Sequence, residues 1–230
     1  MTASYKLGNP GNPGSPGKKP LQSRFPRLWL AAQYLLAGFF YRGRAIVKHL
    51  GTRRRVLEVG CSVGIDSVHF SKRPCDYLGV DIDADAIAMA SARYKDKAHM
   101  RFRHVDMRTL SPAENTFDFI LFCGSVHHIP DADAVSILNH ATTLLADDGI
   151  MVVIDYALHD QPGWMERFIL ALEEGRHVRD QQAFLAILAQ VRDCEITEQE
   201  IFVNPAFLLP WPVMAHKFCI VMRKRQTVAG

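Results

Sequence analysis

The chain has 230 residues, of which 48% are hydrophobic, so it can bury one substantial core and is too short for two ordinary domains. The net charge of +3 is spread along the chain apart from the run Arg53–Arg55, which argues against a nucleic-acid-binding surface. The five cysteines form no CxxC pair and lie in or beside apolar runs, which is typical of reduced core residues in a cytoplasmic protein. We therefore expect a single cytoplasmic domain.

The first 50 residues divide into two segments of contrasting composition. Residues 1–22 contain the stretch GNPGNPGSPGKKP, which predicts a disordered tail. Residues 23–50 predict one or two helices that cap the domain, because their apolar stretch is shorter than the roughly 20 residues of a membrane span and no signal-peptide cleavage site follows it. A helix on a membrane surface stays open as a second interpretation. The basic residues that motivate it are Arg24, Arg27, Arg42 and Arg44.

From Arg55 onward, short apolar runs alternate with helical patterns. Strands are predicted at residues 56–59, 77–80, 100–105, 117–122 and 150–154, and helices at 65–71, 84–94 and 134–145. Asp83 and Asp133 are the expected N-caps of the latter two helices. Two more helices are predicted between residues 159 and 191, before final strands at 194–203 and 216–224. This order indicates an open, mostly parallel α/β sheet with helices on both faces, which binds ligands beyond the carboxyl ends of its strands.

The loop after the first strand, VLEVGCSVG at residues 56–64, is typical of a ligand-binding turn. Gly60 allows a tight turn, Gly64 lets the next helix pack closely, and the short side chains of Cys61 and Ser62 leave the backbone open to a ligand. About twenty residues later Asp81 ends the second strand, where a carboxylate can accept hydrogen bonds from two ribose hydroxyls. Dinucleotide enzymes and S-adenosylmethionine enzymes both use this arrangement.

The later motifs separate these two classes. A GxGxxG fingerprint would need glycine where this chain has Ser62 and Ile65, which disfavours a nicotinamide-dependent oxidoreductase. Residues 55–155 instead resemble the class I S-adenosylmethionine-dependent methyltransferases, particularly the type 11-like family of small-molecule enzymes. The motifs that carry the resemblance are VLEVGCSVG, GVDID (79–83), VDM (105–107), FDFILFCGSVHHIPD (117–131) and LLADDGIMVVID (144–155). The resemblance implies a seven-stranded, Rossmann-like sheet with an antiparallel last strand, and the cofactor S-adenosyl-L-methionine, which leaves as S-adenosyl-L-homocysteine.

The resemblance assigns roles to the residues that follow the second and third strands. Asp81 would hold the ribose hydroxyls, and Ile82 would pack on the adenine face. Asp106 would accept a hydrogen bond from the adenine amino group, and the backbone N–H of Met107 would donate to a ring nitrogen. The residues themselves also allow a helix cap for Asp83 and an ordinary turn at Asp106 and Met107.

The methionine part of the cofactor would lie between the first loop and the end of the fourth strand. Its ammonium group needs acceptors such as the Glu58 carboxylate, and its carboxylate suits exposed backbone N–H groups. Related proteins usually have glycine where this chain has Ser62, so the chain adds a side chain near the cofactor. The residues assigned to this half are Glu58, Gly60, Cys61, Ser62 and Gly64, with Cys123 and Gly124 on the opposite side.

The sequence contains few signals that identify catalytic residues. Methyl transfer from a sulfonium is an in-line displacement, so holding donor and acceptor in line supplies much of the acceleration without a side-chain nucleophile. His127 follows the fourth strand and has a pKa range suited to a general base. The family often has the pair of His127 and His128 whatever the substrate, which favours a structural or gating role. The histidines and carboxylates show no ligand spacing that would indicate a metal site.

Substrate choice is expected to come from segments around the sheet. We expect residues 51–230 to form the methyltransferase domain, with a helical insertion near 160–178 that forms a lid together with the aromatic N-terminal helix, and with residues 207–212 as part of the wall. The aromatic content favours a small apolar or aromatic methyl acceptor, methylated at oxygen, nitrogen or carbon, and no nucleic acid. The alternatives are a lipid or quinone acceptor at a membrane surface and a non-catalytic cofactor-binding module. The oligomeric state stays open.

Overall fold

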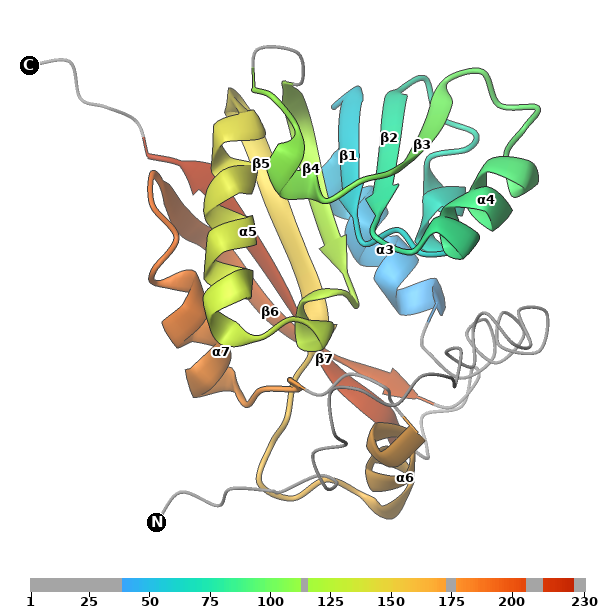
Figure 1. The fold of residues 1–230 in the computed structure, drawn as a ribbon. Coiled ribbons are helices and arrows are strands. Elements are labelled where there is room, and N and C mark those ends of the chain that lie inside the picture. Colours follow the sequence, from blue (N-terminus) through green and yellow to red (C-terminus); the bar gives the residue numbers. More distant parts are fainter. Residues whose placement is uncertain (1–38, 113–115, 173–176, 206–212, 226–230) are drawn as a thin grey trace, which may run out of the picture.

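The seven strands of the computed structural model form one sheet, in the order β3-β2-β1-β4-β5-β7-β6 (Figure 1). The structure describes residues 39–112, 116–172, 177–205 and 213–225. β7 runs antiparallel to both β5 and β6, and the pairs among β1 to β5 are parallel, so the predicted sheet is confirmed. The strands are β1 (Arg55–Val59), β2 (Asp76–Asp81), β3 (Met100–His104), β4 (Phe117–Cys123), β5 (Leu145–Tyr156), β6 (Cys194–Pro205) and β7 (Val213–Lys224).

Both faces of the sheet are covered, which explains why its central strands are continuously apolar. On one face, α5 (Asp131–Leu144) and α7 (Gln181–Leu188) pack onto a core that includes Leu57, Ile120 and Phe218. On the other face, α3 (Phe39–Leu50) packs through Ile46 and Leu50. α4 (Ala84–Arg93) lies next to β2 and β3.

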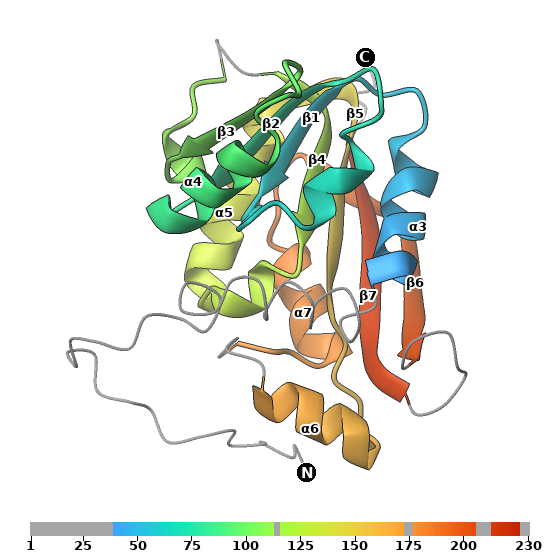
Figure 2. The same cartoon turned by 90° about the vertical axis from the view of Figure 1, so that its right-hand side faces the viewer.

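α6 (Trp164–Leu172) stands apart from these layers. It lies beyond the carboxyl ends of the parallel strands, next to the start of β7 (Figures 1 and 2). Tyr156, Leu170 and Ala215 form a small hydrophobic cluster that joins α6 to β5 and β7. None of the described helices is long and apolar enough to cross a membrane.

Two local predictions are wrong. The predicted helix at 65–71 is only a 3-10 turn, η1 (Asp66–His69), because Pro74 ends a segment too short to offset the cost of starting an α-helix. α5 begins at Asp131, two residues before the predicted N-cap Asp133, because the N-cap is Pro130, whose ring holds its own φ at −56°, a value that suits helix entry. The predicted cap at Asp83 is confirmed, since its side chain accepts hydrogen bonds from the N–H groups of Asp85 and Ala86.

Several expectations fall on residues outside the described ranges. These are the tail at 1–22, the first part of the N-terminal cap up to residue 38, and the wall segment at 207–212. Within the described part, Arg42 of α3 is not available to contact a membrane surface, because it is buried and its Nε donates to Asp66 Oδ1 at 3.3 Å. Asp66 offsets the burial of this guanidinium and raises its pKa. Arg44 is exposed.

Candidate functional site

The sheet topology defines where a ligand would lie. The strand order reverses between β1 and β4, and open α/β sheets bind ligands at the carboxyl ends of the strands beside such a switch point. The loops after the two strands meet there, because a Cβ added to Gly60 would lie 2.6 Å from the Cβ of Ser125. Gly60 is therefore required both by this close approach and by its φ of +73°.

The loop after β1 contains a non-glycine residue in the left-handed region. Ser62 has a φ of +47°, which costs an L-residue about 1 kcal/mol. This conformation explains why glycine is the usual residue of the resembling family at this position. The backbone N–H of Ser62 donates to Asp81 Oδ2 at 2.8 Å.

Ser62→Gly is expected to raise the free energy of unfolding by about 0.5 kcal/mol, because glycine adopts a positive φ without the steric cost. Urea denaturation measures the change. Ser91→Gly is the matched control of opposite sign, since Ser91 is exposed within α4 and glycine weakens a helix interior. A loss of stability in both variants would contradict the interpretation of the loop.

Asp81 links the two loops that would hold a nucleoside. Besides accepting from Ser62 through Oδ2, it accepts from the backbone N–H of Asp83 through Oδ1 at 2.9 Å. Each carboxylate oxygen can accept a further hydrogen bond. The side chain is therefore fixed in orientation and retains acceptor capacity for a ribose diol.

Glu58 lies at the end of β1 and is almost completely buried. Its Oε2 accepts hydrogen bonds from Ser67 Oγ at 2.9 Å and from Tyr77 Oη at 2.5 Å. Burial, assisted by the negative charge of Asp66, raises the pKa of Glu58 to about 8. A buried carboxyl group with a pKa this high gains from an added positive charge, such as the ammonium group that the resemblance assigns to it.

The structure places Ile82, Asp106 and Met107, the residues that the resemblance assigns to adenine, after the ends of β2 and β3, in different environments. The side chain of Ile82 is 75% exposed, unusual for isoleucine and suited to stacking against a flat ring. Asp106 caps the turn η2 (Met107–Thr109) and pairs with Arg108 at 2.6 Å, and the hydrogen bond from Arg108 lowers its pKa. Met107 buries its side chain in the core. An adenine contact by Asp106 would have to share the carboxylate with Arg108.

The end of β4 supplies the opposite side of the site. Burial raises the pKa of both the Cys61 and the Cys123 thiol well above the ordinary value, so neither is a thiolate nucleophile. Gly124 has a φ of +64°, and among the described residues a Cβ there would meet only His127, at 3.9 Å, which leaves room for a close approach. The hydroxyl of Ser125 is buried and has no hydrogen-bond partner among the described residues. An unpartnered buried hydroxyl at the switch point fits a polar ligand.

His127 belongs to a buried pair that the sequence did not indicate. Its Nδ1 lies 2.5 Å from Asp155 Oδ1, and its backbone N–H donates to Asp155 Oδ2 at 3.0 Å. Burial acts to raise the pKa of Asp155, but the charge of His127 and its hydrogen bond outweigh burial and lower it. An ionised Asp155 accepts from Nδ1–H and makes Nε2 the basic nitrogen of the ring. The only sequence signal for Asp155 was an acidic residue inside a buried apolar strand.

A seven-stranded sheet of this order, with a glycine-containing loop after β1 and a carboxylate ending β2, is the architecture of the class I S-adenosylmethionine-dependent methyltransferases. Residues 56–149 match the model of a family described as a methyltransferase domain. The resemblance seen in the sequence is thus confirmed over residues 56–149, which match a methyltransferase domain.

One curated relative and two solved structures give the extent of the similarity. A ubiquinone biosynthesis O-methyltransferase from Rhodopseudomonas palustris strain TIE-1 is 32% identical over 101 residues, which are 43% of this chain and 38% of that relative. The N-methyltransferase NodS from Bradyrhizobium japonicum WM9, in complex with S-adenosyl-L-homocysteine, has a TM-score of 0.62 at 17% identity, over 81% of this chain and 87% of that one. A TehB-like S-adenosylmethionine-dependent methyltransferase from Corynebacterium glutamicum ATCC 13032 Kitasato has a TM-score of 0.62 at 21% identity, over 90% of this chain and 100% of that one. The two structures establish the fold.

Proposed function

We propose that this chain binds S-adenosylmethionine at the carboxyl ends of β1, β2 and β4 and transfers its methyl group to an oxygen, nitrogen or carbon atom of a small apolar or aromatic molecule. The observation that carries the proposal is the Asp81 carboxylate, which is held by the N–H groups of Ser62 and Asp83 and still has acceptor capacity. When bound, S-adenosylmethionine supplies a methyl group already activated by the sulfonium.

Different side chains of the site would bind different parts of the cofactor. Asp81 would accept from the ribose hydroxyls, and exposed Ile82 would cover one face of adenine. Glu58, Ser125 and the backbone of residues 60–62 would hold the polar amino-acid end. Held by these groups, the methyl donor would meet the acceptor in line.

We propose further that His127 takes the proton of the acceptor when the methylated atom is a hydroxyl oxygen or an amine nitrogen. Asp155 fixes the ring through Nδ1 and stabilises the imidazolium that forms when the other nitrogen takes a proton. Asp155 is then a positioning residue. It also accepts from the Tyr156 N–H at 2.7 Å, which fixes the carboxylate in turn.

His127→Gln is expected to lower the methylation rate about 100-fold or more and to leave the affinity for S-adenosylhomocysteine unchanged, because a general base acts on the acceptor and not on cofactor binding. His128→Gln, next to it and exposed, is the matched control. The rate is measured as transfer of a radiolabelled methyl group. Equal rates in the two variants would assign His127 a structural role.

The acceptor class is supported by one relative and by the composition of α6, the helix that we expect to contribute to a lid. The Rhodopseudomonas palustris relative acts in ubiquinone biosynthesis, and the chain spans about two fifths of its length. Trp164 and Phe168 are 63% and 55% exposed and lie one helical turn apart on α6, beyond the carboxyl edge of the sheet. An aromatic or quinone-like phenol, including one presented at a membrane surface, fits both observations.

The test is calorimetric titration with S-adenosylmethionine, S-adenosylhomocysteine and a reduced nicotinamide dinucleotide, followed by an acceptor panel of catechols, other phenols and amines. We expect micromolar binding of the first two ligands and S-adenosylhomocysteine formation with a phenolic acceptor. Binding of the dinucleotide alone would overturn the proposal. Cofactor binding with no turnover across the panel would favour a non-catalytic cofactor-binding module.

A further inference from the structure

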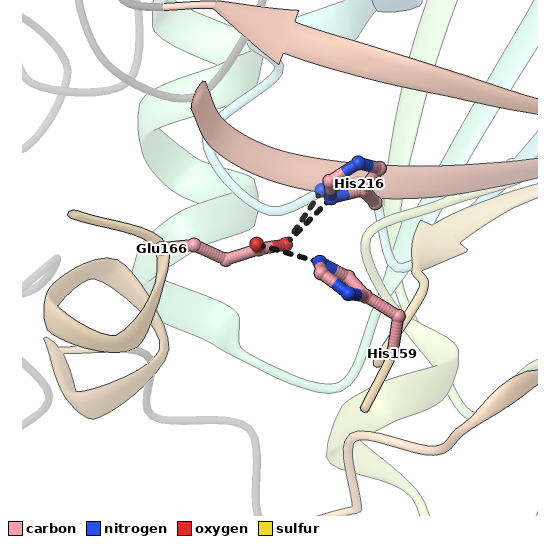
Figure 3. Close-up of side chains that lie close together, drawn as sticks. All are labelled: His159, Glu166 and His216. Atoms are coloured by element: carbon pink, nitrogen blue, oxygen red, sulfur yellow. Dashed lines mark hydrogen bonds and ion pairs between the residues drawn. The ribbon is translucent and has the colours of Figure 1, made fainter. Parts of the chain in front are cut away.

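Three polar side chains from distant parts of the chain meet beside α6, and none of them belongs to the set of site residues described above (Figure 3). His159 lies in the loop after β5, Glu166 lies in the first turn of α6, and His216 lies in β7. We name them the His159–Glu166–His216 cluster.

The geometry of the cluster is convergent. Glu166 Oε2 lies 2.9 Å from His159 Nε2, and Glu166 Oε1 lies 2.9 Å from His216 Nδ1. The two imidazole rings are edge to face, with centroids 4.3 Å apart. One nitrogen of each ring and one carboxylate oxygen all lie within 4.8 Å of one another, so small side-chain movements would bring them around a single ion.

The acidic member of the cluster is buried, and the two imidazoles are partly exposed. The Glu166 side chain is only 3% exposed, whereas His159 is 39% and His216 26% exposed. Burying a carboxylate is costly unless a positive group compensates it. Among the described residues no lysine or arginine pairs with Glu166, whose partners are the two imidazoles and the backbone N–H of His216. A bound cation would supply the compensating charge.

The donor set identifies the kind of cation. Two imidazole nitrogens and one carboxylate oxygen suit zinc and the divalent first-row metals, and not magnesium or calcium, which take oxygen ligands. Three protein ligands leave the fourth position of a tetrahedral zinc ion to water or another ligand.

We propose that the His159–Glu166–His216 cluster binds one divalent transition-metal ion, which ties α6 to β7 next to the carboxyl edge of the sheet. The ion joins three segments that otherwise meet through the small hydrophobic cluster of Tyr156, Leu170 and Ala215. The proposal does not depend on methyl transfer, and its test uses no turnover.

The test is equilibrium dialysis of untagged, chelator-treated protein against zinc, with cobalt absorption bands as a report on tetrahedral coordination. We expect one zinc ion per chain at micromolar concentration, and a melting temperature several degrees higher at saturating zinc. His159→Gln and Glu166→Gln are expected to weaken binding at least 100-fold. His99→Gln, on the opposite edge of the sheet, is the control and should bind zinc like the unaltered protein.

No binding at a zinc concentration about 100 times higher than micromolar would overturn the proposal. The cluster would then only link α6 to β7 through hydrogen bonds. Zinc binding of unchanged strength in His159→Gln would also overturn it, because the ion would then lie elsewhere, for example on a cysteine. His159 lies in a loop and is partly exposed, so this variant decides the question even if Glu166→Gln does not fold.

Discussion

Replacement of Asp81 with alanine is expected to lower the affinity for S-adenosylhomocysteine about 100-fold or more. Each hydrogen bond from a hydroxyl to a carboxylate contributes about 1.5 to 3 kcal/mol, and two ribose hydroxyls would be involved. A 100-fold loss corresponds to about 2.7 kcal/mol. The variant also releases the N–H groups of Ser62 and Asp83, so the loop after β1 loses its support from β2. Calorimetric titration measures the change.

Two further variants separate these contributions. Asp96→Ala removes an exposed carboxylate in the loop after α4 and should leave the affinity unchanged. Asp81→Asn keeps one acceptor oxygen but presents an amide NH₂ to the backbone N–H donors, so we expect an intermediate loss. Equal affinities in Asp81→Ala and Asp96→Ala would mean that the ribose does not lie at the end of β2.

Glu58→Gln is expected to remove a pH-dependent loss of stability. The pKa of Glu58 is about 8 in the folded protein against an ordinary value of 4.5. Between these values the folded state keeps a proton that the unfolded state releases. The contribution of Glu58 to the free energy of unfolding is therefore fully present below pH 4.5 and is lost as the pH rises toward 8. The loss between pH 5 and pH 8 is about 3 kcal/mol.

The glutamine side chain stays neutral throughout this range, so the gap in the free energy of unfolding between the variant and the unaltered protein should change steadily with pH. Urea denaturation at several pH values measures it. Glu195→Gln, an exposed position on β6, is the control and should show no such trend. A constant gap between pH 5 and pH 8 would mean that Glu58 is already ionised in the folded protein.

The same residue couples cofactor binding to proton release. An ammonium group next to Glu58 favours the charged carboxylate, so binding near pH 7 should release about one proton, measurable by calorimetry in buffers of different ionisation enthalpy. Glu58→Gln should abolish the release and weaken binding about tenfold. Binding with no proton release in the unaltered protein would place the ammonium group elsewhere.

The sequence predicted the parallel sheet well because its strands are covered on both faces and so read as unbroken apolar runs, as in the segment 117–122 that became β4. The sequence was a less reliable guide to where helices form and begin, because local backbone geometry determines both. The segment 65–71 has helical spacing but is too short to propagate, and Pro130 moves the start of α5 ahead of Asp133.

The candidate site was predictable only where its residues are close in sequence. The loop at 60–64 and Asp81 follow the successive strands β1 and β2, in a sequence pattern that is known to bind nucleotides. Asp155 and His127 are 28 residues apart, and nothing in the chain order indicates that their side chains meet. The same holds for His159 and His216, which are joined only because β7 inserts beside β5.

The position of β7 also has a consequence for folding during synthesis. β5 gains its second neighbour only after α6, α7 and β6 have been made, so until then the edge of β5 near Val152 and Ile154 presents unsatisfied backbone groups and apolar side chains. An exposed apolar edge of this kind can pair with another nascent chain. Substitutions that slow the docking of the β6–β7 hairpin should therefore lower the yield of native protein through aggregation, even where they leave the native state equally stable.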